Sequence, residues 1–311
     1  MPVKLGYLLP TRECVMQGRH ETAPLLDLAR RAETLGYDSL WVGDSVTARP
    51  RHDALTLLSA VAVAAPRMEL GTAVLLPALR NPVLLAHQVA TLDRIAEGRF
   101  ILGIGIASDV PNIRAEFAAC GVPFEKRVGT MMEALRLCRA LWSGQPVDWD
   151  GRWQMQGATI GPTPHRKGGP PIWIGGNQQP SLERVAHHFD GWFPNKPDAD
   201  GFADGMRRIG HIAQDAGRDP AAITGAMYLT LAIDDDAARA EARLDAFMQH
   251  YYGQPAQVIR ARQVAYGGPA HGAAEWIAGY ARAGASHLVL RFAGDPIPQL
   301  EAMARVRNTV G

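Results

Sequence analysis

Short apolar runs alternate with amphipathic segments along almost the whole chain. The clearest case is residues 68–109, where the apolar runs MELGTAVLL and FILGIG flank a segment with Leu85, Val89 and Leu92 at helical spacing. Gly98 follows as a helix stop signal. Two consecutive strands joined through a helix run parallel, because a parallel pair needs a long crossover connection. This stretch therefore predicts one strand-helix-strand unit of a parallel α/β fold.

Strand-like runs that each precede a helical pattern occur eight times. They are Val3–Leu9, Ser39–Gly43, Glu69–Leu75, Phe100–Gly105, Pro171–Gly175, Gly191–Phe193, Gly225–Ile233 and His287–Phe292. The helical patterns include Pro24–Leu35, Asp53–Ala65, Arg127–Trp142, Pro180–His188, Gly201–Ala216, Asp235–Tyr252, Ala273–Ala283 and Pro298–Val306. Strand then helix, eight times over, predicts an α/β fold of the (β/α)8 TIM-barrel type, as a single domain over residues 1–311.

Two segments do not fit a bare barrel. Residues 145–170 combine the alternating run VDWDGRWQMQG with a stretch rich in proline and glycine, which predicts a hairpin insertion. Residues 235–271 hold two helical patterns and a Gly-Gly-Pro loop. Loops on a barrel rim often close over a ligand, so we interpret this second insertion as a lid.

Composition narrows the class of partner. The 32 Lys and Arg residues balance 31 Asp and Glu residues, so nothing in the charge favours nucleic acid or an anionic membrane. The three cysteines include no C-x-x-C pair, and no apolar stretch approaches the length of a membrane-spanning helix. We expect a cytoplasmic protein with a small-molecule substrate and no metal site.

Several motifs, in order, carry a family resemblance. KLGYLLP, ARRAETLGYDSLWVGDS, GTAVLLPALRNPVLLAHQVATLDRIAEGRFILGIG, GVPFEKR and PPIWIGGN resemble the luciferase-like flavin-dependent oxidoreductases of the bacterial luciferase superfamily. The match runs from about residue 3 to 195 and resumes near residue 272. The resemblance implies a TIM barrel that binds FMN or the deazaflavin F420, and it also implies a homodimer.

The fifth strand ends in a glycine pair followed by a helix. Free backbone N–H groups and a helix N-terminus at such a turn suit a phosphate group. In the resembling family this loop contributes to binding the cofactor phosphate, which makes candidate ligands of Gly175, Gly176, Asn177 and Gln178. The alternative is a tight turn that needs glycine only for its backbone conformation.

Charged and polar residues at two other strand ends are the catalytic candidates. Asp44 and Ser45 follow the second strand, where a side chain faces the barrel mouth. Resembling proteins often carry an acidic residue here followed by histidine, so Ser45 removes the basis for a histidine base. Arg291, at the end of the eighth strand, is the third candidate, as an inward-facing cation. The alternatives are a turn or N-cap residue for Asp44 and a surface arginine for Arg291.

The third and fourth strands supply the remaining cofactor candidates. Resembling proteins place a non-proline cis peptide at the end of the third strand, although the residues alone favour an ordinary buried strand. Small residues at the end of the fourth strand allow a flat ring to approach the backbone, with Ala107 in place of the third glycine of a GxGxG pattern. The cofactor-binding candidates from these strands and from the end of the first are Leu8, Thr72, Ala73, Val74, Gly105, Ile106 and Ala107.

These features favour a monooxygenase or oxidoreductase that uses reduced FMN on a small organic substrate, with a flavin reductase as a partner. One alternative is hydride transfer by F420 in the same fold. Another is a non-catalytic flavin-binding protein, because the residues at 45 and 108 are serines where some resembling proteins have acid–base groups. We interpret Trp41 and Trp173 as core residues and Trp149, Trp153 and Trp192 as candidates for a pocket wall.

Overall fold

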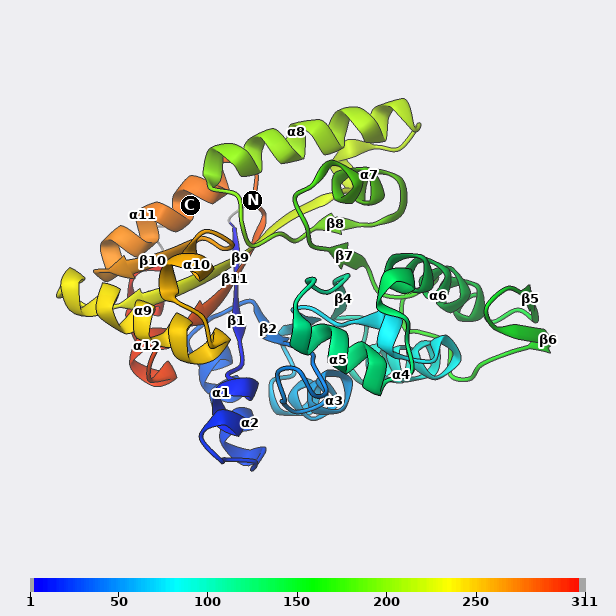
Figure 1. Cartoon of the computed structure of the whole chain (residues 1–311), viewed down its shortest axis with the longest axis horizontal. Helices are drawn as coiled ribbons and strands as arrows, with labels where there is room; N and C mark the ends of the chain where they lie inside the picture. The colour runs from blue at the N-terminus through cyan, green and yellow to red at the C-terminus, as the bar shows by residue number, and fades with distance from the viewer. Residues whose placement is uncertain (1–2, 308–311) are drawn as a thin grey trace.

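Eight parallel strands close into a barrel in the computed structural model, which describes residues 3–307 (Figure 1). Each strand pairs with the next, β8 pairs with β9, and β11 returns to β1, so that the cylinder is closed. The barrel strands are β1 (Lys4–Leu8), β2 (Ser39–Val42), β3 (Glu69–Thr72), β4 (Phe100–Ile104), β7 (Ile172–Ile174), β8 (Gly191–Trp192), β9 (Thr224–Ile233) and β11 (His287–Phe292). The predicted (β/α)8 barrel is confirmed.

Helices surround the barrel and cover the outer faces of the strands (Figure 1). They are α1 (Thr11–Met16), α2 (Ala23–Thr34), α3 (Ala54–Ala64), α4 (Pro82–Ile95), α5 (Pro111–Ala119), α6 (Arg127–Trp142), α7 (Gln179–His188), α8 (Ala199–Asp215), α9 (Ala237–Tyr252), α10 (Ala256–Arg260), α11 (Ala270–Arg282) and α12 (Pro296–Val306). Three 3-10 turns accompany them: η1 (Pro77–Leu79), η2 (Phe124–Lys126) and η3 (Pro220–Ala222). No helix within residues 3–307 is long and apolar enough to cross a membrane.

Both predicted insertions are present. The antiparallel hairpin of β5 (Val147–Asp150) and β6 (Gln154–Ala158) projects away from the barrel (Figure 1). The second insertion contains α9 and α10 and, unexpectedly, a further strand, β10 (Ala265–Gly268), which pairs in parallel with β9. Its sequence, AYGG, has neither length nor alternation, so its strand conformation depends on pairing with its neighbour.

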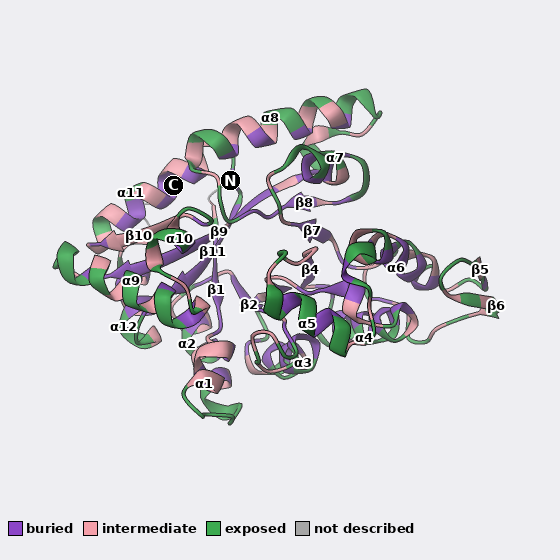
Figure 2. Ribbon diagram, viewed as in Figure 1, coloured by how far each residue is buried: buried purple, intermediate pink, exposed green. Residues whose placement is uncertain are grey.

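The strands of the barrel are buried, while the helices keep exposed outer faces (Figure 2). Aromatic rings contact one another in the barrel interior. Trp41 is completely buried, stacks on Trp173 with ring centroids 5.5 Å apart, and contacts Phe193 at 5.1 Å. Gly71 on the next strand leaves room for it, because a Cβ there would collide with the six-membered ring of Trp41. The interpretation of Trp41 and Trp173 as core residues is confirmed.

A buried histidine completes this interior layer. The Nε2 atom of His287 lies 2.6 Å from Oγ of Ser39, and that hydroxyl also accepts a hydrogen bond of 2.7 Å from Trp41 Nε1. Burial, together with the charge of Lys4, lowers the pKa of His287 to about 3. The folded protein therefore holds this imidazole in its neutral form throughout the physiological range.

We expect this histidine to make the protein less stable as the pH falls below about 6.5. Between about pH 6.5 and pH 3 the unfolded chain binds a proton on His287 and the folded protein does not. Lowering the pH in this range therefore favours the unfolded state. At pH 5 the contribution is about 2 kcal/mol. Urea unfolding at pH 7 and pH 5 should show that the free energy of unfolding falls less in a His287→Gln variant than in the parent. A variant of the exposed His87, His87→Gln, serves as the control; parallel losses in the parent and His287→Gln would contradict the expectation.

Candidate active site

A cavity of about 360 Å³ lies at the carboxyl ends of the barrel strands, and we call it the ring cavity. It brings together ten of the residues predicted from the sequence: Asp44, Ser45, Ala73, Val74, Gly105, Ile106, Ala107, Gly175, Gly176 and Arg291. These residues come from five different strand ends. Carboxyl ends of barrel strands are where enzymes of this architecture place their chemistry.

The end of β3 forms one side of the ring cavity. The peptide bond between Ala73 and Val74 is cis, as the resemblance implied and as the residues alone did not. The chain then returns to the sheet: Leu75 donates to Gly103 O at 2.8 Å, and its own carbonyl accepts from Gly105 N at 2.9 Å. A Cβ at Gly105 would lie 2.7 Å from Cγ2 of Val74. The glycine is therefore required for the close approach of the two strand ends that line the cavity.

The loop after β4 holds a residue in an uncommon conformation. Ala107 has φ of +65°, in the left-handed region that favours glycine. The side chain of Arg127 fixes the neighbouring backbone by donating from Nε to Ile106 O at 2.9 Å and from Nη1 to Phe124 O at 3.0 Å. Ala107, which stands where the family pattern has a glycine, therefore adopts a backbone conformation typical of glycine.

The glycine pair after β7 forms the opposite rim. Gly176 has φ of +101°, and a Cβ there would lie 2.6 Å from Oγ of Ser181 on α7. Its carbonyl accepts a hydrogen bond of 2.7 Å from Trp192 Nε1. Trp192 is therefore a buried support for this loop and not the pocket-wall residue we expected; Trp149 and Trp153 belong to the hairpin segment and do not line the ring cavity either.

Four predicted cofactor ligands lie outside the lining of the ring cavity. Asn177 and Gln178 follow Gly176 and lead into the first turn of α7. Thr72 has no exposed surface, and its hydroxyl donates to Gly103 O at 2.7 Å. Leu8 packs in the barrel interior and lines a neighbouring cavity.

Asp44 is held in a nearly buried ion pair. Its side chain is 3% exposed, and Arg80 contacts both carboxylate oxygens, from Nη1 at 2.6 Å and from Nη2 at 2.8 Å. Leu76 N donates to the same carboxylate at 3.0 Å. Arg80 Nη2 also forms an ion pair with Oδ2 of Asp53 at 3.2 Å. Asp44 therefore ties the segment after the cis peptide to the end of β2.

Ser45 is occupied in a similar way. Its hydroxyl donates to Oε1 of Glu116 at 2.7 Å, and the amides of Val46, Thr47 and Ala48 converge on the same oxygen. Burial works to raise the pKa of Glu116, but these hydrogen bonds outweigh it and hold that pKa below its usual range. Ser45 organises the loop after β2 through an ionised carboxylate.

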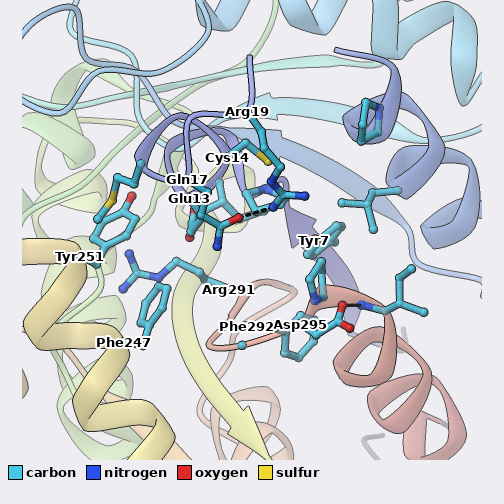
Figure 3. Close-up of a pocket in the computed structure, with 18 of the residues that line it drawn as sticks. Tyr7, Glu13, Cys14, Gln17, Arg19, Phe247, Tyr251, Arg291, Phe292 and Asp295 are labelled. Atoms are coloured by element: carbon cyan, nitrogen blue, oxygen red, sulfur yellow. Dashed lines mark hydrogen bonds between the residues drawn. The ribbon is translucent and has the colours of Figure 1, made fainter. Parts of the chain in front are cut away.

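Arg291 is enclosed by aromatic rings. It is 2% exposed, donates from Nη1 to Tyr252 Oη and from Nη2 to Thr230 Oγ1, both at 3.0 Å, and lies 4.7 Å from the ring centroid of Tyr251. Figure 3 shows its guanidinium between Tyr251 and Phe247. Arg291 is therefore a buried residue of the cavity lining, and its catalytic role stays a prediction.

Several residues of the ring cavity were missed from the sequence: Arg49, Arg51, Tyr228, Tyr251 and Tyr252. The adjacent tyrosines at the end of a predicted lid helix were the available signal, because paired rings there can reach over a barrel mouth.

A second cavity, of about 970 Å³, lies beside the ring cavity between α1, α2, α9 and the start of α12. The two cavities share Tyr251 and Arg291 as lining residues, and Figure 3 shows both side chains in the second cavity. The hydroxyl of Tyr7 lies buried in the lining of this second cavity and has no hydrogen-bond partner among residues 3–307.

The family model for luciferase-like monooxygenases matches residues 3–309. The chain belongs to this family. The similar proteins described below are named as a reductase, dehydrogenases and a monooxygenase.

Curated relatives of this luciferase-like protein include F420-dependent enzymes. It is 32% identical to a 5,10-methylenetetrahydromethanopterin reductase of Methanolobus tindarius, over 68% of this chain and 62% of that protein. It is 36% identical to an F420-dependent glucose-6-phosphate dehydrogenase of Nocardia farcinica, over 48% of this chain and 46% of that one. The match thus spans about half to three fifths of these relatives.

Solved structures share the fold along the full chain. An F420-dependent secondary alcohol dehydrogenase in complex with an F420-acetone adduct superposes with a TM-score of 0.85 at 20% identity, covering 100% of both chains. The oxygenating constituent of 3,6-diketocamphane monooxygenase from Pseudomonas putida, in complex with FMN, gives 0.77 at 16% identity over 100% of this chain and 98% of that one. Luciferase-like enzymes of both cofactor types therefore share this barrel.

Proposed function

We propose that this protein is an F420-dependent oxidoreductase that transfers hydride between the deazaflavin and a small organic substrate. The observation that carries the proposal is the polar, cationic wall of the ring cavity, formed by Arg49, Arg51 and Arg291 with three tyrosines. Reaction of a reduced flavin with oxygen is favoured by an apolar lining that excludes water. The F420-dependent relatives support the same choice over the FMN monooxygenase that the sequence first favoured.

The residues of the ring cavity fit a flat cofactor with a phosphate. Ala73 and Val74 offer a bulged backbone for the ring to pack against, and Gly105 keeps that side of the cavity free of a side chain. Gly175 and Gly176 precede α7, whose N-terminus and free N–H groups suit an anion. When bound, the deazaflavin supplies a hydride donor or acceptor, and the protein supplies binding, orientation and proton transfer.

Tyr228 is the residue we assign to proton transfer. It lines the ring cavity, and its hydroxyl takes part in none of the hydrogen bonds within the described part of the chain. Burial raises the pKa of Tyr228 well above its usual value, although the charge of Arg291 works to lower it. The hydroxyl therefore stays protonated at neutral pH and can donate to an oxygen of the substrate when hydride is added.

A Tyr228→Phe variant should turn over about 100-fold more slowly, because it loses the proton donor and little else. Its affinity for F420 should stay within about twofold of the parent, since the ring of residue 228 is kept. Single-turnover kinetics and a cofactor titration separate the two quantities. Unchanged turnover in this variant would remove Tyr228 from the proposal.

Titration of the purified protein with F420 and, in parallel, with FMN tests the cofactor. We expect tight F420 binding with negligible FMN binding, read from the change in cofactor absorbance or fluorescence. FMN binding with oxygen-dependent turnover would instead support the monooxygenase, and binding of either cofactor without turnover on a broad substrate panel would support the non-catalytic alternative. No affinity for either cofactor would refute the proposal.

A further inference from the structure

We propose that the arginine-lined wall of the ring cavity binds an oxyanion carried by the substrate, a carboxylate or a phosphate ester. This inference rests on the proposed function, because it names the substrate class of the same cavity. The residues concerned, which we call the arginine cluster, are Arg12, Arg49, Arg51 and Arg291.

The arginine cluster carries more positive charge than its surroundings neutralise. Glu13, on α1, is the carboxylate whose charge acts on both Arg51 and Arg291. Asp44 also lines the ring cavity, but Arg80 already contacts both of its oxygens. The charges of Arg12, Arg51 and Arg291 all act on Glu13, so three guanidinium groups share this one carboxylate, and Arg49, Arg51 and Arg291 line the cavity. Such an arrangement favours an anionic ligand.

Several N–H groups of the cluster lack acceptors. Both Nη atoms of Arg291 donate within the protein, whereas its Nε, and Nε and Nη1 of Arg12, are buried without a partner among residues 3–307. Arg51 donates from Nε to Arg49 O at 3.1 Å and from Nη2 to Tyr251 Oη at 3.3 Å. Buried donors of this kind cost free energy until they find an acceptor, and an oxyanion in the ring cavity supplies one to Arg291, which lines it; Arg12 lies outside the lining and contributes through its charge.

The backbone beside the cluster is shaped for a guanidinium. Gly43 follows β2, and a Cβ there would collide with Nη1 of Arg51. The same Cβ would lie 3.5 Å from Ala73 O, the carbonyl of the cis peptide. The Arg51 guanidinium therefore lies against the backbone after β2, at the wall of the ring cavity.

The position of the cluster separates it from the proposed phosphate site of the cofactor. Gly175 and Gly176 follow β7, whereas Arg291 lies near the end of β11, three strands from β7 in the closed strand order. Arg291 also lies 5.4 Å from the ring centroid of Tyr228. An oxyanion held by the arginines therefore places the remainder of the substrate beside the proposed proton donor.

The test is a titration of the full-length, cofactor-free protein with sodium phosphate and, separately, with sodium acetate, at an ionic strength held constant with sodium chloride. Calorimetry or thermal shift reports binding. An Arg51→Gln variant should bind at least about tenfold more weakly, because it loses a charged donor. An Arg19→Gln variant removes an equal charge from an exposed residue outside the ring cavity and should stay within about twofold. Far-UV circular dichroism checks that both variants fold.

Titration of the same variants with F420 separates the outcomes. Loss of anion binding in Arg51→Gln with F420 affinity unchanged supports the inference, and the tighter of the two probes assigns a phosphate ester or a carboxylate. Absence of phosphate and acetate binding in the parent, or equal loss in Arg19→Gln, overturns it even if F420 binds. Equal weakening of F420 in Arg51→Gln also overturns it, because the cluster would then hold the cofactor. Anion binding without any cofactor affinity leaves the oxyanion site standing and removes the proposed function.

Discussion

Replacing Trp41 with alanine should lower the free energy of unfolding by about 3–5 kcal/mol, which is the range for truncating a large buried aromatic residue. The indole is fully buried and stacks between Trp173 and Phe193, and its Nε1 hydrogen-bonds to Ser39. Its removal leaves a void that neighbouring strands of a closed barrel cannot fill by moving together. Urea unfolding followed by circular dichroism measures the loss.

A double-mutant cycle with Gly71 gives this prediction its control. Gly71→Ala alone should destabilise the parent by about 1–3 kcal/mol, because the new Cβ collides with the Trp41 ring. In the Trp41→Ala background the same change should cost much less, since the collision is gone and the methyl group enters the void. If the losses of unfolding free energy were additive, the methyl group at residue 71 and the Trp41 ring would not compete for the same space. Trp153→Ala, in the projecting hairpin segment, should be milder than Trp41→Ala.

Replacing Asp44 with asparagine should lower the free energy of unfolding by about 3 kcal/mol, because breaking a buried ion pair leaves a charge without its partner. The charge in question is Arg80, which contacts both oxygens of Asp44 and retains only the more exposed Asp53. The loss should be accompanied by weaker cofactor binding, since Asp44 also accepts from Leu76 in the segment after the cis peptide.

Removing the unpaired charge should restore much of this stability. An Asp44→Asn, Arg80→Met double variant has no buried guanidinium to compensate, so chemical denaturation should place it closer to the parent than Asp44→Asn alone. Asp53→Asn is the matched control and should cost no more than about 1 kcal/mol, because asparagine still caps α3 and only the more exposed ion pair with Arg80 is lost. Full stability and cofactor affinity in Asp44→Asn, combined with lost turnover, would instead make Asp44 the catalytic group that the sequence suggested.

The barrel was predictable because its strands and helices are long enough to show their own periodicity. All eight strand runs and the helix at residues 127–142 match observed elements. Among the described α-helices and strands, α1, α5 and β10 were missed. Helix α1 is six residues long, and α5 lies in the connection between β4 and α6. Strand β10 has four residues and is stabilised by pairing with β9. Short elements depend on tertiary contacts, which local patterns do not contain.

The candidate site was predictable where function requires a particular backbone, as at Gly105 and Gly176. It was not predictable where a side chain reaches the cavity from a distant segment. Tyr251 lies on α9 and meets Arg51 across two hundred residues of sequence, and nothing in either local pattern indicates the contact. The roles of Asp44 and Ser45 were equally hidden, because their partners Arg80 and Glu116 lie elsewhere along the chain. The homodimer and the reductase partner stay predictions.

The second insertion leaves and rejoins the molecule at one point. Asp234 N donates to Gly268 O at 3.0 Å, and Ile233 pairs with Gly268, so the two ends of residues 234–268 are neighbours on β9 and β10. This segment contributes Tyr251 and Tyr252 to the ring cavity, while the surfaces proposed to hold the cofactor belong to the barrel. We therefore expect that residues 234–268 can be replaced by the corresponding segment of a relative. Such a replacement should alter which substrate is accepted and leave the residues of the proposed cofactor site unchanged.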